Sequence, residues 1–153
     1  MMHTGINFLK EPENTEARGA MLLGAHYAGT AIENSMLGAA HTCANPLTTR
    51  CGINHGTAVA LMLPHVIRFN SVAAKELYNE LANCANLNST EGLAKHIDSF
   101  RQEACLPGRL SECGVNREEL RPLAQEAIGQ WTAKFNPRPV SDQDLFDLYE
   151  RAF

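Results

Sequence analysis

Apolar residues recur at helical spacing through most of this 153-residue chain. Between residues 15 and 44, for example, Ala20, Leu23 and Tyr27 lie three or four positions apart. No segment of useful length alternates apolar and polar residues as a half-buried strand would. A chain of this length can bury most of its apolar surface in one core. The pattern therefore predicts an all-α multi-helix bundle that forms a single helical domain over residues 1–153.

Capping residues and prolines predict where the helices begin and end. Pro46 and Pro64 are expected to end helices, because a residue before proline is pushed out of the α region. We therefore expect one long helix to about Ala44, either continuous or broken near Ile32, and then a loop up to Asn54. The predicted helix starts are Asn14 or Thr15, Asn54, Ser71, Ser89 or Thr90, Asn116 and Ser141.

The first long helix carries four glycines, Gly19, Gly24, Gly29 and Gly38. Each costs about 1 kcal/mol relative to alanine in a helix interior. Glycines at such a cost are expected only where another group approaches this backbone closely. The approaching group is either another helix, packed tightly against a face of small residues, or a ligand.

Charge and cysteine content limit the partners and the compartment. The net charge is −4 and no Lys/Arg cluster is present, so neither nucleic acid nor an anionic membrane is an expected partner. No apolar run reaches the roughly 20 residues that span a bilayer, and no signal sequence is visible. The five cysteines are odd in number and lie outside any CxxC spacing, which favours reduced thiols. We therefore expect a cytoplasmic protein.

Two histidines, His41 and His55, lie fourteen residues apart on either side of a turn that contains Pro46. If both lie at helix ends, the turn can fold their imidazoles towards a common point, which would suit a divalent metal. The positive end of a helix dipole disfavours a protonated ring, so His55 can offer a lone pair. Capping or packing roles for both histidines remain the alternative.

Cys43 and Cys51 flank the same turn and raise a second possibility, a zinc site built from these two thiols with His41 and His55. His26 would lie about 22 Å from His41 along a continuous helix, too far to share one ion. The remaining histidines are expected at helix ends, on the surface or in a mobile tail: His65, His96 and His3.

Nucleotide-binding and hydrolase motifs are missing from the sequence. It contains no GxGxxG, P-loop, GxSxG or HExxH pattern. Without a strand that leads into a Gly-rich turn, the chain has no Rossmann-type pyrophosphate site. We therefore do not expect it to bind NAD(P) by itself.

The segment "GAAHTCANPLTTRCGINHGTAVALMLPHVIRFN" closely resembles the metal-binding segment of the iron-containing (group III) alcohol dehydrogenases. The resemblance continues upstream in "EARGAMLLGAHYAGTAIENSMLG". Downstream it is looser, in "LPGRLSECGVNREELRPLAQEA" and "NPRPVSDQDLFDLYERAF". Nearly the whole chain is covered, and the resemblance implies the C-terminal helical domain of that family, with a dehydroquinate synthase-like fold.

In that family a Rossmann-like domain precedes the helical domain, and one Asp and three His hold a metal. The resemblance places the second and third His ligands at His41 and His55. The Asp and first His lie four apart on an earlier helix, and no Asp occurs before His41 here. Many relatives carry a further histidine, implicated in catalysis, where this chain has Asn45. Other relatives share the sequence "ANPLT" found here.

The resemblance thus implies part of an NAD(P)-dependent alcohol and aldehyde oxidoreductase that carries two of the four metal-ligand positions. We expect iron or zinc to bind weakly or not at all, and the chain to be inactive alone. Exposed small-residue and apolar surface predicts a homo-oligomer or a separate partner that contains the cofactor domain. The alternative is a non-catalytic helical oligomerisation or binding module that retains the fold.

Overall fold

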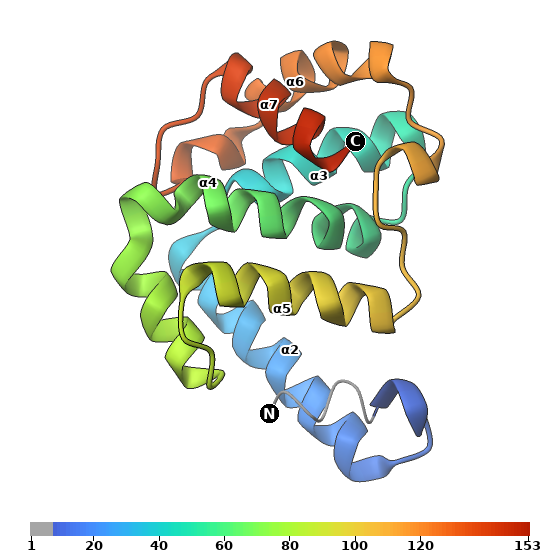
Figure 1. Cartoon of the computed structure of the whole chain (residues 1–153), viewed down its shortest axis with the longest axis vertical. Helices are drawn as coiled ribbons and strands as arrows, with labels where there is room; N and C mark the ends of the chain where they lie inside the picture. Colours follow the sequence, from blue (N-terminus) through green and yellow to red (C-terminus); the bar gives the residue numbers. More distant parts are fainter. Residues whose placement is uncertain (1–7) are drawn as a thin grey trace. The chain divides into compact units, whose positions relative to one another are not determined.

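A computed structural model describes residues 8–153 of the chain (Figure 1). Every regular element within these residues is helical, and none of them lies in a strand, which confirms the all-α prediction. The chain divides into two compact units, Met1–Met36 and Leu37–Phe153, and each is described by itself. The single domain over residues 1–153 stays a prediction, and His3 lies outside the described residues.

The first unit consists mainly of one helix, α2 (Thr15–Ser35). The Asn14 side chain caps it and accepts a hydrogen bond from the Ala17 amide at 3.0 Å, as the sequence predicted. The helix ends at Ser35, near the expected break. Within the described part of this unit, a Cβ added at any of the three glycines of α2 would meet no atom within 4 Å. The unit by itself therefore shows no group that needs a glycine face.

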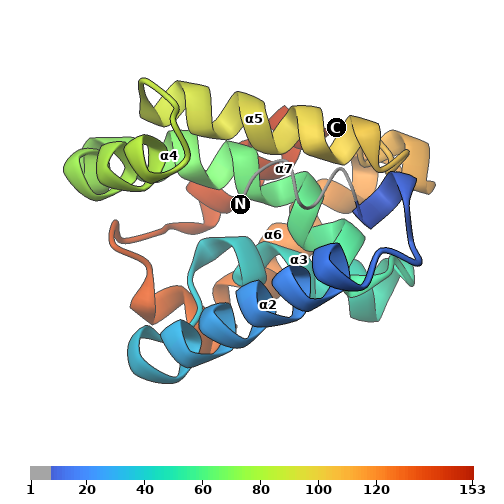
Figure 2. The same ribbon diagram turned by 90° about the horizontal axis from the view of Figure 1, so that it is seen from below.

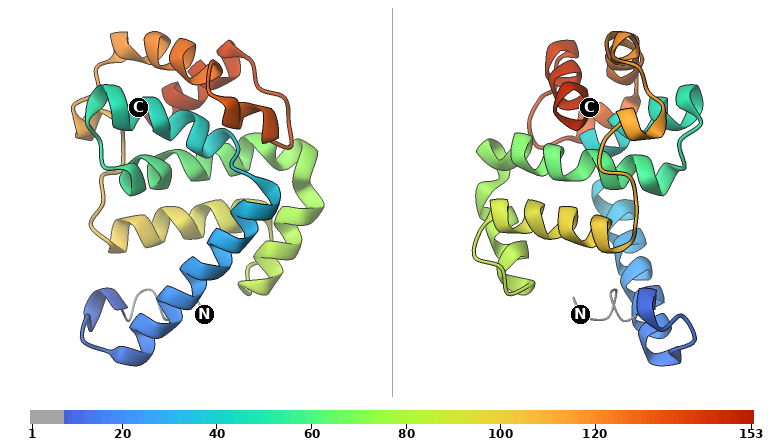
Figure 3. Two further views of the ribbon diagram at one scale, coloured as in Figure 1. Left: turned by 180° about the vertical axis from the view of Figure 1, so that it is seen from behind. Right: turned by 45° about the vertical axis from the view of Figure 1, so that its right-hand side comes forward.

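The second unit is a bundle of five α-helices and three short 3-10 turns (Figures 1 and 3). Helix α5 runs beside the first part of α4, α3 and α7 pack on α4, and α6 packs against α3 and α7 (Figures 1 and 2). The α-helices are α3 (Ala39–Cys51), α4 (His55–Cys84), α5 (Thr90–Glu103), α6 (Leu120–Ile128) and α7 (Asp142–Ala152). The 3-10 turns are η1 (Ser111–Cys113), η2 (Arg117–Glu119) and η3 (Trp131–Phe135).

The core of this unit lies where α3, α4, α6 and α7 meet. Full burial of a Leu, Met or Tyr side chain stabilises a fold by roughly 1.5–3 kcal/mol. Burial of this cluster therefore fixes α3 between α4, α6 and α7. Its largest fully buried side chains are Leu47, Met62, Leu110, Leu120, Leu123, Leu145, Leu148 and Tyr149.

The expectation that Pro46 ends a helix was wrong. Pro46 lies inside α3, which continues to Cys51. A proline in a helix interior typically costs about 3 kcal/mol, because it removes one backbone hydrogen bond and crowds the preceding turn. Here the ring is fully buried, and Cys43, Ala44 and Leu47 around it have no exposed surface. Burial of this face offsets the cost and keeps the segment helical.

The expectation for Pro64 was also wrong, since α4 passes through it and ends at Cys84. The separate helix predicted after Ser71 is instead the second half of α4, which bends at Ala74 (φ −125°, ψ 27°) (Figure 3). Among the described residues, α4 is the helix whose length and composition would allow it to cross a membrane. Half of its most apolar 18-residue stretch is buried inside the structure, as in the core helix of a folded domain.

The other helix starts agree with the sequence. Asn54 caps α4, and its side chain accepts from the Thr57 amide at 3.3 Å. Ser89 caps α5 through the Gly92 amide at 3.1 Å. Ser141 opens α7 in a capping box with Asp144, and Asn116 with Glu119 forms another before α6. Local side-chain chemistry therefore determines where these helices begin.

Candidate metal centre

The turn between α3 and α4 is built around Gly52. Its φ of +68° is left-handed, a conformation that glycine adopts without a Cβ penalty. The amides of Gly52 and Ile53 both bond back to the carbonyl oxygen of Leu47, which satisfies one of the free carbonyl groups at the end of α3. Asn54 then starts α4 at once. The turn reverses the chain within three residues and directs the first turn of α4 towards α3.

This reversal brings His41 and His55 together. Their ring centroids lie 5.4 Å apart, with the ring planes inclined by 48°. His41 is half-buried and His55 is exposed. The expectation that His41 lies near the end of a long helix was wrong, because it lies in the first turn of α3. The two rings are nevertheless neighbours, as the sequence predicted.

Burial lowers the pKa of His41, and the neighbouring His55 lowers it further. A ring in this position resists protonation because it has lost part of its hydration and faces another basic ring. The neutral imidazole is the form that binds a metal ion. The surroundings of His41 therefore favour the form that can act as a ligand.

Two further residues of α3 share the face of His41. Asn45 lies four residues on, and its amide donates to Gln130 Oε1 at 3.1 Å. Thr48 lies another three residues on, and its hydroxyl oxygen is 3.4 Å from His55 Nδ1. Thr48 and Gln130 were not predicted to lie at this site. A helix continued through Pro46 would have placed Thr48 on this face, because spacings of four and seven residues share one side.

The cysteines lie differently. Cys43 has no exposed surface, and burial raises the pKa of its thiol to about 12. The Tyr149 hydroxyl donates to the Cys43 carbonyl oxygen at 2.7 Å. Cys51 is half-buried, and burial raises its pKa, with a further rise from Glu119. Between residues 8 and 153, no three His, Cys, Asp or Glu side chains gather as a metal-ligand group. The zinc site with two thiols therefore gains no support.

Within Leu37–Phe153, His65 and His96 form no metal-ligand group with this pair. His26 lies on α2, which ends at Ser35, so His26 and His41 do not share one continuous helix. The distance expected along such a helix therefore does not apply. His96 lies in the middle of α5. His65 lies in the interior of α4 rather than at a helix end and is half-buried, and burial lowers its pKa, as does the positive charge of Arg68.

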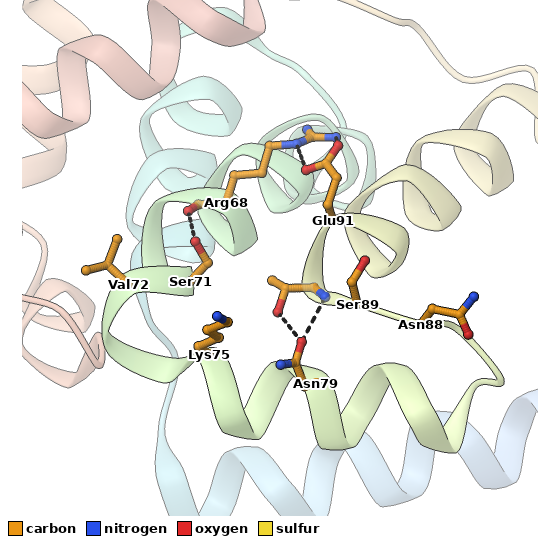
Figure 4. Close-up of a pocket in the computed structure, with 9 residues that line it drawn as sticks. Arg68, Ser71, Val72, Lys75, Asn79, Asn88, Ser89 and Glu91 are labelled. Atoms are coloured by element: carbon orange, nitrogen blue, oxygen red, sulfur yellow. Dashed lines mark hydrogen bonds and ion pairs between the residues drawn. The ribbon is translucent and has the colours of Figure 1, made fainter.

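A cavity of about 680 Å³ lies between α4 and the start of α5, and neither His41 nor His55 lines it. In Figure 4, Arg68 is paired with Glu91 and Ser71 bonds to the Arg68 backbone, while no interaction is drawn for Lys75 or Asn88. Arg68 donates to Glu91 at 2.9 and 3.1 Å, and Asn79 Oδ1 accepts from the backbone and side chain of Thr90. We assign no ligand to it.

The residues from Leu37 onwards thus form a helical bundle in which two imidazoles lie next to each other. The sequence model described as "Fe-containing alcohol dehydrogenase family, C-terminal" matches residues 2–153. The chain belongs to this family, as the resemblance implied.

Similar proteins include Escherichia coli lactaldehyde reductase, 30% identical over 147 residues, 90% of this chain. Klebsiella pneumoniae 1,3-propanediol dehydrogenase is 29% identical over 148 residues, 92% of this chain. The chain spans 38% of the length of both.

Solved structures agree with this membership. The crystal structure of a 1,3-propanediol oxidoreductase matches with a TM-score of 0.88 and 26% identity, over 99% of this chain and 44% of that one. Alcohol dehydrogenase from Oenococcus oeni has a TM-score of 0.89 at 24% identity, again over 99% and 44% of the two chains. The latter likeness concerns the fold alone.

Proposed function

We propose that this chain is the helical, metal-holding part of an oxidoreductase that interconverts alcohols and aldehydes, with His41 and His55 as two of its metal ligands. The observation that carries the proposal is the 5.4 Å separation of the two rings, in a chain of the Fe-containing alcohol dehydrogenase family. The names of its relatives, which include lactaldehyde reductase and an NAD-dependent methanol dehydrogenase, support short alcohols and aldehydes as the substrate class.

The residues present fit a divalent ion such as iron or zinc. Neutral imidazole nitrogen is a good ligand for both metals. Such ions take roughly four to six donors, so two rings leave the remaining positions to water or to another polypeptide. We therefore propose weak, exchangeable binding to this chain.

A metal held in part by His41 and His55 would supply Lewis-acid polarisation of a substrate oxygen, and NAD(P) bound to other polypeptide would supply the hydride chemistry. The roles of this chain are to hold and to orient. His41 and His55 would donate nitrogen lone pairs, and the helical face behind them would exclude water from one side. Asn45, held by Gln130, lies one turn beyond His41 and provides a polar group on the same face.

The chain spans 38% of the length of lactaldehyde reductase. We therefore propose that additional polypeptide, beyond these residues, supplies the nicotinamide-binding part and the remaining metal ligands. The nicotinamide-binding part would come from a separate cofactor-domain partner, while further copies of the chain could supply only metal ligands. We also propose a cytoplasmic location. All five cysteines are free in the structure, which suits a reducing compartment.

Calorimetric titration of the chain with Zn²⁺ tests the ligand assignment. We expect weak binding that is lost in His41→Ala and in His55→Ala, because one imidazole cannot hold the ion alone. His96→Ala serves as the control, since it removes a histidine of α5 and should leave the affinity unchanged. Equal affinity in all four proteins would refute the assignment.

The alternative of a non-catalytic oligomerisation module has its own support. Trp131 and Phe135 on η3 are 54% and 48% exposed, and their rings pack edge to face at 5.7 Å. Exposed aromatic pairs of this kind mark interaction surfaces. This function requires self-association without metal, which light scattering coupled to size-exclusion chromatography would detect. A monomer at high concentration would exclude it.

A further inference from the structure

Thr48 makes two contacts through a single hydroxyl group. Its Oγ1 lies 3.1 Å from the carbonyl oxygen of Ala44, one turn back in α3. The same oxygen lies 3.4 Å from Nδ1 of His55, which reaches it across the Gly52 turn. His55 is the first residue of α4, so this contact links α3 directly to the proposed ligand.

Counting protons assigns the direction of both hydrogen bonds. A hydroxyl group has one proton to donate and lone pairs to accept with. A carbonyl oxygen can only accept, so in the shorter contact the Thr48 hydroxyl donates its proton to the Ala44 carbonyl oxygen. With that proton used, Oγ1 is left as an acceptor towards His55, an arrangement that places the proton of the neutral ring on Nδ1. The lone pair of the ring consequently lies on Nε2.

We propose that Thr48 is a positioning residue that holds His55 in the Nδ1–H tautomer, so that Nε2 is the nitrogen offered to a divalent cation. The inference rests on the proposed function for the role of His55 as a ligand. A metal-binding histidine commonly donates its other ring N–H to an oxygen acceptor, and loss of that acceptor typically weakens metal binding by about 10–100-fold. Here the acceptor would be a threonine hydroxyl on the neighbouring helix.

Nitrogen-15 NMR of the metal-free chain reads the tautomer directly. Spectra would be recorded at about pH 8, where a free imidazole is neutral, and the His55 signals identified by their loss in His55→Ala. We expect a protonated Nδ1 and an unprotonated Nε2 in the unmodified chain. Thr48→Val keeps the branched shape but removes the hydroxyl, and should shift the proton towards Nε2. Thr48→Ser should retain the Nδ1–H form.

Thr49→Val provides the matched control. Thr49 is the next residue of the same helix, and its hydroxyl oxygen lies 3.1 Å from the Asn45 carbonyl oxygen and 3.3 Å from Glu126 Oε1 rather than next to His55. The His55 tautomer should not change in this variant. A proton on Nε2 in the unmodified chain, or an unaltered Nδ1–H form in Thr48→Val, would overturn the inference.

Zinc affinity supplies the second measurement. We expect Thr48→Val to weaken Zn²⁺ binding by about 10-fold or more, with Thr48→Ser and Thr49→Val close to the unmodified chain. A changed tautomer with unchanged affinity would overturn the positioning role. If the unmodified chain binds no Zn²⁺, the proposed function fails, while the NMR result still decides whether Thr48 sets the tautomer.

Discussion

Tyr149 illustrates how single residues hold the framework of the candidate site. Its ring is fully buried, and its hydroxyl donates to the Cys43 carbonyl oxygen at 2.7 Å, joining α7 to α3 two residues after His41. Burial raises the pKa of Tyr149, so the hydroxyl keeps its proton and remains a donor. The contact fixes the depth of α3 in the core and, with it, the place of the first imidazole.

Replacing Tyr149 with Phe should lower the free energy of unfolding by about 1–2 kcal/mol, because it removes one buried hydrogen bond without creating a cavity. Urea denaturation measures the change. Tyr27→Phe is the control, since Tyr27 is 58% exposed on α2 and should have little effect. Equal stability of the Tyr149→Phe variant and the unmodified chain would show that the hydroxyl adds nothing to the fold.

His65 should make the stability of the protein depend on pH. Burial lowers its pKa, as do Arg68 on α4, Arg101 on α5 and Arg151 on α7, while Asp98 opposes them. The unfolded chain therefore binds a proton more readily, and stability should fall as the pH decreases through about 6.5 towards the lowered pKa. Replacement by Gln should make this decrease smaller in urea denaturation at a series of pH values. The same pH dependence in both proteins would contradict the assignment.

At the scale of elements, the turn between α3 and α4 determines whether the two imidazoles meet. Gly52 at φ +68° closes α3, while Gly129 closes α6 at φ −74°, a value open to any residue. Gly52→Ala should therefore destabilise the chain by about 1–2 kcal/mol through backbone strain. Gly129→Ala should change the stability much less. Thermal unfolding of both variants makes the comparison, and equal losses would exclude strain at Gly52 as the cause.

Local signals in the sequence predicted most of the helix starts, but Ser71 starts no helix and neither Pro46 nor Pro64 ends one. Asn54, Ser89 and Ser141 cap their helices through hydrogen bonds within three residues, so a sequence pattern reveals them. Pro46 and Pro64 were misread because burial in the core, a long-range effect, overrides the local preference of proline. Because a helix was expected to end before Pro46, Thr48 was not expected to contact His55. That contact requires α3 to continue past Pro46.

At the scale of the molecule, spacing alone singled out the histidine pair but favoured capping or packing roles for it, whereas the resemblance located the family and implied the metal role. Long-range contacts such as Tyr149 with Cys43, or Asn45 with Gln130, join residues 85 to 106 positions apart. No local pattern reveals them. They nevertheless fix α3 against α7 and η3, and so place the face on which His41 lies.

Diffraction from a crystal of the chain soaked with zinc, with data collected on both sides of the zinc absorption edge, tests the central claim most directly. We expect an anomalous peak bonded to one nitrogen of His41 and to Nε2 of His55, at about 2.0–2.1 Å from each. Zinc bound elsewhere, with the two rings turned away from each other, would contradict it.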